Sequence, residues 1–493
     1  MINRRDFIRS TGLAAFGLSV SRRLGVANGR KKEEALNFLF ILVDDLGCRD
    51  LGFSGSTFYE TPNLDRFRAQ GMRFTDAYAA CPVCSPTRAS LLTGRYPARV
   101  GVTDWIGAHS SGRLLEVPYT DHLPLTETSL ARALKEGGYA TWHVGKWHLG
   151  AEPYFPKRHG FDVNIAGCEW GAPKHGYFSP WGLPTMSDSP EGTYLTDRLT
   201  DEAIALIRRN DGSPFFLNLW YYAVHTPIQA KPDKIAKYEE KAKALGLDQM
   251  QAFEEGEHFP CDHKRHLRVR RRLIQSDPVY AAMVESLDEN VGRLLAVLDE
   301  EGIADDTLVV FTSDNGGLAT SEGSPTCNAP LSEGKGWMYE GGTREPWIVR
   351  WPGVVAPRSE CRVPVSSPDV YPTVLEAAGL DPLPQQHVDG VSLMGLLTGA
   401  DALDRGAIYW HYPHYGNQGG TPGSSIRAGD LKLIEFYEDK RLELYDLRAD
   451  LSEEHNLAPE RPKVAGELCR MLVAWREDVE AIIPEPNPSW SAE

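Results

Sequence analysis

Four strongly apolar segments recur along the chain, and each is followed at once by polar or charged residues. They begin near residues 36, 139, 214 and 307. Short, continuous apolar runs of this kind predict strands that are buried on both faces of a sheet. Apolar residues at helical spacing precede the last of them, at Val284, Leu287, Val291, Leu294 and Leu298. Strands that alternate with helices predict an α/β fold with a large mixed, mostly parallel sheet flanked by helices.

Shorter elements are predicted between these segments. Helices are expected near 63–70, 126–138 and 200–208, and a strand near 72–78. Residues 165–195 are rich in Gly, Pro, Ser and aromatic side chains, which predicts a long loop of the kind that often serves as a lid or binding loop. Residues 231–275 predict a polar helical insertion that ends in a basic run.

The pattern changes past residue 400, where short strands and turns replace the long apolar segments. Strands are predicted at 407–412, 425–428, 431–437 and 442–447. The helix that follows carries Leu468, Met471, Leu472 and Trp475 on one face. We therefore expect a main domain over 35–400 and a smaller C-terminal α+β subdomain, with a small antiparallel sheet and a helix, over 405–493.

Oxygen-bearing side chains follow two of the predicted strands. Asp44 and Asp45 end the first strand, and Asp314 and Asn315 follow the last. In parallel sheets such ends meet at one edge, where ligands bind. Taken alone, the first pair could equally be solvated aspartates that cap a strand. Together the four residues offer hard oxygen ligands, which suit one Ca²⁺ ion, or less well Mg²⁺, rather than zinc.

A second chemical feature is the stretch Cys84-Ser85-Pro86-Thr87-Arg88, which runs on to Gly94. Proline is tolerated in the first turn of a helix and glycine commonly ends one, so a helix is predicted here. Cys84 would lie at its N-terminus, where free N–H groups favour anions, with Arg88 one turn later on the same face. An ordinary amphipathic helix is the alternative.

Bulk composition limits the possible functions. The chain has 493 residues, of which 42% are hydrophobic and 24% charged, as in an ordinary globular protein. A net charge of −16 argues against nucleic acid as a partner, because phosphate binding needs a basic surface. Eight cysteines are few for this length, and no second pair completes a zinc site with Cys81 and Cys84. Disulfide pairing cannot be predicted from their spacing.

The N-terminal residues resemble a twin-arginine export signal, with the sequence Asn-Arg-Arg-Asp-Phe at 3–7 and a weakly apolar core at 11–20. We expect a signal peptide over 1–27, the twin-arginine machinery as a partner, and a periplasmic or secreted bacterial protein. A basic leader without an export role is the alternative. No other segment is apolar for about 18 residues, so no stable membrane insertion is expected.

The Cys84 stretch, with its extension Ser-Leu-Leu-Thr-Gly-Arg at 90–95, resembles the signature of the type I, formylglycine-dependent sulfatases of the alkaline-phosphatase-like superfamily. Five further motifs occur in the family's order: Asp-Asp at 44–45, Gly-Lys-Trp-His-Leu-Gly at 145–150, His-Thr-Pro at 225–227, Ser-Asp-Asn-Gly-Gly at 313–317, and the run from Lys335 to Pro346. The resemblance covers roughly residues 36–450, and within the family the chain is similar to arylsulfatases and N-acetylgalactosamine sulfatases. Glu345 departs from the family, in which a hydrophobic residue is more usual.

The resemblance implies a role for each matched residue. Cys84 would be oxidised by a formylglycine-generating enzyme to Cα-formylglycine, whose hydrated aldehyde is the nucleophile. The metal would be held by Asp44, Asp45, Asp314 and Asn315, together with residue 84. Arg88, Lys146 and Lys335 would bind and neutralise the sulfate. His225, with Lys335, would protonate the departing alcohol, and His148 would then take a proton from the remaining hydroxyl, which expels sulfate.

The implied reaction is hydrolysis of sulfate esters to an alcohol and inorganic sulfate, and 35–400 becomes the catalytic domain. For an exported member of the family, the expected substrate is a sulfated carbohydrate, such as galactose or N-acetylgalactosamine sulfate. The expected role is the degradation of sulfated polysaccharides. His175 and Arg427 are candidate sugar contacts. Three alternatives stay open: a sulfated-glycan binding protein in which Cys84 is unmodified, a related phosphatase or phosphodiesterase, and, more weakly, a thiol hydrolase.

Overall fold

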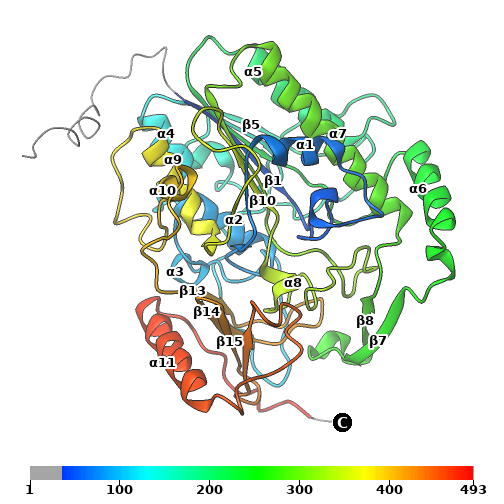
Figure 1. Ribbon diagram of the computed structural model, residues 1–493, viewed down its shortest axis with the longest axis vertical. Coiled ribbons are helices and arrows are strands. Elements are labelled where there is room, and N and C mark those ends of the chain that lie inside the picture. Colours follow the sequence, from blue (N-terminus) through cyan, green and yellow to red (C-terminus); the bar gives the residue numbers. More distant parts are fainter. Residues whose placement is uncertain (1–35, 492–493) are drawn as a thin grey trace, which may run out of the picture.

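The computed structural model describes residues 36–491, so the predicted signal peptide at 1–27 lies outside the described residues. An eight-stranded sheet forms its centre (Figure 1), in the order β11-β2-β10-β9-β1-β6-β4-β5. The four predicted apolar strands are neighbours at its middle, as β1 (Asn37–Val43), β4 (Ala140–Gly145), β6 (Phe215–Trp220) and β9 (Thr307–Ser313). They are parallel to one another and to β5 (Val163–Ile165).

The remaining strands of this sheet make it mixed. They are β2 (Met72–Phe74), β10 (Trp347–Arg350) and β11 (Ser359–Cys361). Of these, β10 runs antiparallel to both of its neighbours, β9 and β2, whereas β11 is parallel to β2. The predicted fold class, a mostly parallel mixed sheet in an α/β protein, is therefore confirmed.

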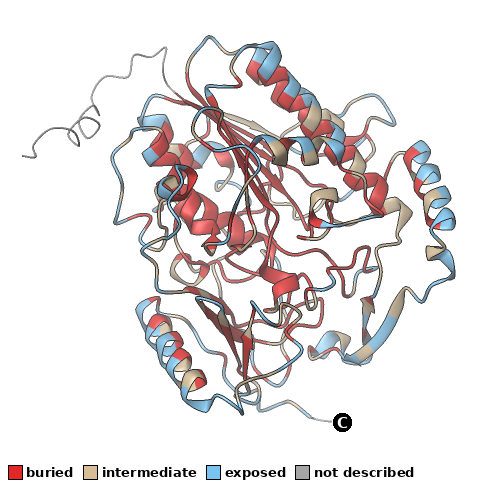
Figure 2. Ribbon diagram, viewed as in Figure 1, coloured by how far each residue is buried: buried red, intermediate tan, exposed pale blue. Residues whose placement is uncertain are grey.

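Helices cover both faces of the sheet (Figure 1). One layer holds α1 (Pro62–Gln70), α5 (Leu195–Arg208) and α7 (Pro278–Glu300), and the other holds α2 (Cys84–Thr93), α4 (Leu130–Glu136), α9 (Val370–Ala377) and α10 (Met394–Leu397). Successive residues of β1 alternate between two cores, with Leu39 and Ile41 in the first and Phe38 and Phe40 in the second. Burial on both faces explains the continuous apolar runs, and Figure 2 shows these strands buried along their length.

A second, smaller sheet lies at the C-terminal end of the chain, at the bottom of Figure 1. It is antiparallel and contains β13 (Ile408–Tyr412), β14 (Gly423–Ala428), β15 (Leu431–Phe436) and β16 (Leu442–Asp446). The helix α11 (Pro462–Asp478) packs on one face through Leu468, Leu472 and Trp475. The other face meets the main body around Tyr78 and Met338. The predicted small sheet and helix are thus confirmed.

Two predicted elements differ from the structure. The strand expected over 72–78 is split into β2 and β3 (Ala77–Tyr78), and β3 pairs with β12 (Val365–Ser366) in a separate two-stranded sheet. The insertion at 231–275 is helical only in α6 (Pro232–Ala244), and then forms a hairpin of β7 (Phe253–His258) and β8 (Arg268–Arg272). Opposed charges pair across this hairpin, Glu254 with Arg271 and Glu255 with Arg270, so no apolar alternation marked it as β.

Short helices complete the fold, at α3 (Pro97–Val100) and α8 (Glu340–Thr343). None of the helices within residues 36–491 combines the length and the apolar character that crossing a membrane requires. Across the same residues all eight cysteines are free thiols.

Candidate active site

The register of the central strands brings their polar ends together. Val43 of β1 pairs with Ser313 of β9, and Gly145 of β4 pairs with Trp220 of β6. The next residues along the chain therefore emerge side by side at one edge of the sheet. Gly145 is required there, because its φ is +105° and a Cβ would come 1.9 Å from the Trp220 carbonyl oxygen.

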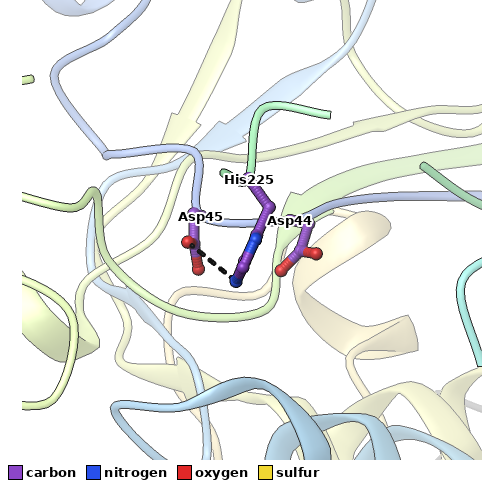
Figure 3. A group of neighbouring side chains, drawn as sticks. All are labelled: Asp44, Asp45 and His225. Atoms are coloured by element: carbon purple, nitrogen blue, oxygen red, sulfur yellow. Dashed lines mark ion pairs between the residues drawn. The ribbon is translucent and has the colours of Figure 1, made fainter. Parts of the chain in front are cut away.

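Three side chains from two neighbouring strand ends touch at this edge. The amide of Asn315 donates to Asp45 at 2.8 Å, and the backbone N–H of Asp45 donates to Asp314 at 3.2 Å. From the end of β6, His225 reaches between the two carboxylates that follow β1 (Figure 3). Its Nε2 lies 3.6 Å from Asp45. The four predicted oxygen ligands, Asp44, Asp45, Asp314 and Asn315, are all buried, and the structure brings them together.

Three buried cations face these acidic groups. The ammonium of Lys146 lies 2.6 Å from Asp44, and that of Lys335 lies 2.9 Å from Asp45. The guanidinium of Arg88 donates to one oxygen of Asp314 from Nε and Nη2, at 2.9 and 2.7 Å. Arg88 also donates to the backbone carbonyl of Lys146. All three predicted sulfate-binding cations therefore lie at this edge of the sheet.

The oxygen atoms of this cluster suit a bound cation. Burial raises the pKa of Asp44 well above its ordinary value, although Lys146 opposes the shift. Burial acts on Asp45 in the same direction, but the combined influence of Lys335, His225 and Lys146 outweighs it and lowers the pKa of Asp45. Asp44 Oδ1 and Asn315 Oδ1 are buried without any hydrogen-bond partner. Unpaired buried oxygens of this kind are costly, so the donor set fits a hard cation such as Ca²⁺.

Cys84 begins α2, and this helix ends at Gly94, which adopts a left-handed φ of 68°. The helix that was predicted from Pro86 and Gly94 is thus confirmed, and every one of its residues is buried. The Sγ of Cys84 lies 3.3 Å from Nδ1 of His148. The other ring nitrogen, Nε2, lies 3.0 Å from the carbonyl oxygen of Ile106, and Ser85 Oγ donates to the carbonyl of His148.

Both members of this contact are neutral. Burial raises the pKa of the Cys84 thiol, although Lys146 and Lys335 oppose that shift. Burial and the charge of Lys146 lower the pKa of His148 well below its ordinary value. Since a carbonyl only accepts, the neutral ring carries its proton on Nε2, and Nδ1 is free to accept one. An unmodified thiol held in this neutral form is a poor nucleophile, which argues against the thiol hydrolase.

A cavity of about 470 Å³ opens above this cluster. Its wall includes four predicted residues, namely Cys84, His148, His225 and Lys335. Prediction missed several others, among them Trp105, Ile106, Trp170, Glu322 and Gln418. Trp170 belongs to the loop at 165–195 whose composition predicted a lid or binding loop. The other four come from loops whose sequence shows neither strand nor helix periodicity, so no signal in the chain pointed to them.

The histidine that follows β6 is also neutral. Its Nδ1 lies 2.7 Å from the carbonyl oxygen of Thr226, so Nδ1 carries the proton, and the unprotonated Nε2 lies 3.6 Å from the Asp45 carboxylate without a hydrogen bond to it. Burial and the charge of Lys335 lower the pKa of His225 to about 3. Burial disfavours the charge on Lys335, but neighbouring anions, Asp45 foremost, raise its pKa above the ordinary value.

The two candidate sugar contacts differ in position. His175 is exposed, and its ring lies 6.2 Å from that of Trp170, which lines the cavity. Arg427 is not part of the cavity wall. It is 3% exposed and donates to Asp76 at 2.7 Å. The interpretation of Arg427 as a sugar contact is corrected, because its guanidinium is used in a buried ion pair that joins the small sheet to the main body.

Glu345, which departs from the family pattern, is also buried, and neither of its carboxyl oxygens has a hydrogen-bond partner. Burial raises the pKa of this carboxyl well above its ordinary value. It is therefore held as the neutral acid, which can occupy a position that usually carries a hydrophobic residue.

Comparison with known proteins identifies the family. The family described as Sulfatase matches residues 36–380, and the family described as N-sulphoglucosamine sulphohydrolase, C-terminal, matches residues 333–478. A sulfatase of Formosa agariphila is 34% identical, over 94% of this chain and 93% of its own length. Human N-acetylgalactosamine-6-sulfatase is also 34% identical, over 76% of this chain and 68% of its own.

A solved structure agrees with these sequence matches. Ps i-CgsB, crystallised with k-i-k-neocarrahexaose, superposes with a TM-score of 0.72 at 29% identity, over 93% of this chain and 95% of its own. The resemblance noted from the motifs, and the alkaline-phosphatase-like fold that it implied, are confirmed. The chain belongs to the sulfatase family and is a sulfuric ester hydrolase.

Proposed function

We propose that this sulfatase hydrolyses carbohydrate sulfate esters, with Cα-formylglycine formed from Cys84 as its nucleophile. The observation that carries the proposal is the position of Cys84. It begins a buried helix at the floor of the cavity, contacts His148 at 3.3 Å, and lies at the same sheet edge as the cations of Lys146 and Lys335.

The residues that would hold calcium are Asp44, Asp45, Asp314 and Asn315, with residue 84 and the substrate completing the shell. When bound, the ion would supply positive charge that polarises the sulfate oxygens and lowers the pKa of an attacking hydroxyl. The two buried oxygens without partners, on Asp44 and Asn315, support this assignment. Calcium is preferred to magnesium because it accepts about 6–8 oxygen ligands in irregular geometry.

Formylglycine would supply two hydroxyl groups on one carbon when hydrated, one to attack sulfur and one to release it. Its formation depends on a formylglycine-generating enzyme in the host. His148 is oriented to accept the proton of the second hydroxyl, because the Ile106 carbonyl holds Nε2–H and leaves Nδ1 directed at residue 84. Ser85 fixes the His148 backbone from the same helix turn.

Binding of the sulfate is assigned to Lys146, Lys335 and Arg88. Each is buried and directed at the acidic cluster, so none needs to leave water when the anion enters. Lys335 holds its proton, whereas Nε2 of His225 is free of one. We therefore assign donation to the leaving alcohol to Lys335 Nζ rather than to His225, and we propose that the neutral His225, which lines the same cavity, contacts the substrate.

The carbohydrate substrate rests on two kinds of support. Two aromatic side chains, Trp105 and Trp170, line the cavity, and such faces suit the stacking of a sugar ring. The names of relatives point the same way, since one is an N-acetylgalactosamine-6-sulfatase and Ps i-CgsB was crystallised with a neocarrahexaose. We propose galactose or N-acetylgalactosamine sulfate, with His175 near the cavity mouth as a sugar contact.

The remaining assignments concern the whole chain. We propose 35–400 as the catalytic domain and 405–493 as the C-terminal subdomain. The N-terminal resemblance to a twin-arginine signal supports export to the periplasm or beyond the cell, in keeping with the degradation of sulfated polysaccharides.

Mass spectrometry of the tryptic peptide from Phe74 to Arg88 tests the nucleophile, on protein produced with a formylglycine-generating enzyme. We expect an aldehyde at position 84 that a hydrazine reagent traps, while Cys81 in the same peptide is alkylated as a thiol. Cys84→Ala should lose both the trapping and the hydrolysis of sulfated sugars. An intact thiol at Cys84 would overturn the mechanism and leave a glycan-binding protein without turnover.

A further inference from the structure

One rim of the catalytic cavity carries a carboxylate in an unusual backbone conformation. Ser321, Glu322 and Ser324 have φ values of 66°, 49° and 43°, and Gly323 between them is also left-handed. Residues other than glycine adopt positive φ rarely and at a cost in free energy. Such strain is kept where the surrounding structure imposes it, and it commonly marks functional positions.

The hairpin β7–β8 holds this segment in place. The N–H of Arg272 donates to the Ala319 carbonyl at 3.0 Å, and Ser324 Oγ donates to the carbonyl of Arg270 at 2.8 Å. The N–H of Ser321 donates to the same Arg270 carbonyl at 3.4 Å. The segment is thus bonded along strand β8, and the hairpin determines where Glu322 stands.

The side chain of Glu322 is also fixed. Gln418, which is 3% exposed and lines the same cavity, donates from Nε2 to Glu322 Oε1 at 3.1 Å. Glu322 is one of the anions that raise the pKa of Lys335. Its carboxylate is therefore held near the sulfate-binding cation rather than directed away from the site. Within residues 36–491 the other carboxylate oxygen, Oε2, accepts no hydrogen bond, so it is available to a ligand.

A fixed carboxylate beside an anion-binding floor restricts what the substrate can present. A second sulfate or a carboxylate of the sugar would face Glu322 with like charge, which is unfavourable. A hydroxyl would instead donate a hydrogen bond to an ionised acceptor, which is a strong type. The cavity wall also carries Glu169 and Lys174, whose charges are opposite, so Glu322 is the carboxylate that a hydrogen bond to another wall residue, Gln418, holds in place.

Resting on the proposed function, we propose that Glu322 is a specificity-determining residue. It accepts a hydrogen bond from a free hydroxyl of the sugar that carries the cleaved sulfate, and it disfavours sugars with a second anionic group there. The substrate class is thus a sugar that bears one sulfate in the cavity and is otherwise neutral. The strained segment and the hairpin serve to place this carboxylate.

The test compares two substrates, N-acetylgalactosamine 6-sulfate and N-acetylgalactosamine 4,6-disulfate, by chromatography of the sugar products. The wild type should have the higher kcat/KM for the monosulfate. In Glu322→Gln, which keeps the shape and removes the charge, we expect the disulfate-to-monosulfate ratio of kcat/KM to rise about tenfold. A ratio measured within one preparation does not depend on the fraction of folded or converted protein.

Glu480→Gln is the matched control, because Glu480 is also an exposed glutamate with a positive φ, of 54°, but lies outside this cavity. Its ratio should equal that of the wild type. Binding is measured in the full chain carrying Cys84→Ser, with and without Glu322→Gln. The ratio of the Kd values for the disulfate and the monosulfate should fall about tenfold when Glu322→Gln is added.

The outcomes separate the two proposals. A ratio in Glu322→Gln within twofold of the wild type, or a wild type that prefers the disulfate, would overturn the role of Glu322. If no sulfate ester is hydrolysed by the wild type, the proposed function fails, and the binding ratio alone still decides the role of Glu322.

Discussion

The thiol of Cys84 lies 3.3 Å from Nδ1 of His148, and the same imidazole is held from behind by the Ile106 carbonyl at 3.0 Å from Nε2. This arrangement sets the tautomer, because only a protonated Nε2 can donate to a carbonyl. The nitrogen that faces residue 84 is therefore a proton acceptor. Burial keeps the ring neutral by lowering its pKa, so it can act as a base over the whole neutral range of pH.

Replacing this base should slow turnover while binding is preserved. In His148→Ala we expect kcat for a sulfated sugar to fall by about 10²–10⁴-fold, the usual contribution of a positioned acid or base. KM should change little, because the sulfate-binding cations remain. Steady-state kinetics measure both constants. His109→Ala is the control, since that side chain is 80% exposed and pairs only with Glu116. A His148→Ala enzyme with near-normal kcat would rule out the assignment.

Calcium should stabilise the protein through the acidic cluster. Binding to the folded state alone adds about 2.7 kcal/mol to the free energy of unfolding when the free ion is at 100 times Kd. We expect a chelator to lower Tm and abolish activity, and Ca²⁺ to restore both more fully than Mg²⁺ does. Asp45→Asn should remove most of the calcium-dependent shift in Tm.

The control for this experiment is Asp439→Asn, because Asp439 is a half-exposed carboxylate paired with Arg441 on the surface. Its response to calcium should match that of the wild type. If Tm of the wild type is the same with chelator and with calcium, the four oxygen ligands do not form a calcium site.

The residues of this site that could be predicted from the sequence are those at the ends of the parallel strands. Asp44 and Asp314 are 270 residues apart in the chain, yet the parallel pairing of Val43 with Ser313 makes them neighbours. Continuous apolar runs marked both strands, and the carboxyl ends of parallel strands always meet at one edge. The motif residues on those ends were therefore predictable, as was the helix that begins at Cys84.

The cavity rim and the hairpin were not predictable in the same way. Glu322 and Gln418 stand in loops, and they meet only because β8 and the small sheet place those loops together. The hairpin itself has no continuous apolar face, since its strands pair Glu254 and Glu255 with arginines and β8 buries only one apolar side chain, Val269. Periodicity reports burial on one face of an element, so it cannot report elements stabilised by paired charges.

The partner of Arg427 could not be predicted from periodicity either, and its position gives a third prediction. It pairs with Asp76 in the buried junction between the two sheets, and Arg344 shares that carboxylate at 3.3 Å. Removing one member of a buried pair costs about 3–5 kcal/mol when the other is left unpaired. Because Asp76 keeps Arg344, Arg427→Met should lower the free energy of unfolding by about the lower figure, 3 kcal/mol. The KM for sulfated sugars should be unchanged. Urea unfolding and kinetics measure the two effects.

Arg441→Met is the matched control for Arg427→Met, since Arg441 is 47% exposed and pairs with Asp439 and Glu443. Exposed pairs contribute about 0–1 kcal/mol, so little change in stability is expected. A stable Arg427→Met protein with a raised KM would return Arg427 to the sugar site.

The fourth prediction concerns Asp104, next to the two cavity residues Trp105 and Ile106. This carboxyl accepts hydrogen bonds from the Trp105 N–H at 2.8 Å and from the Tyr412 hydroxyl at 3.0 Å. Burial raises its pKa from 3.8 to about 8, and the ring of His414, 3.7 Å away, stays neutral because burial lowers its pKa to about 3. The folded protein therefore holds a proton on Asp104 that the unfolded chain releases near pH 3.8.

A group with a raised folded-state pKa favours folding most at low pH, and that contribution is lost as pH rises toward the folded value. One pKa unit corresponds to about 1.4 kcal/mol, so the wild type should lose roughly 3 kcal/mol from this group between about pH 5.5 and about pH 8. Asp104→Asn keeps the accepting oxygen and cannot ionise. We expect urea unfolding to show that the free energy of unfolding of the variant, relative to that of the wild type, rises by about 3 kcal/mol between about pH 5.5 and about pH 8. An equal difference at both pH values would mean that Asp104 is already ionised in the folded protein.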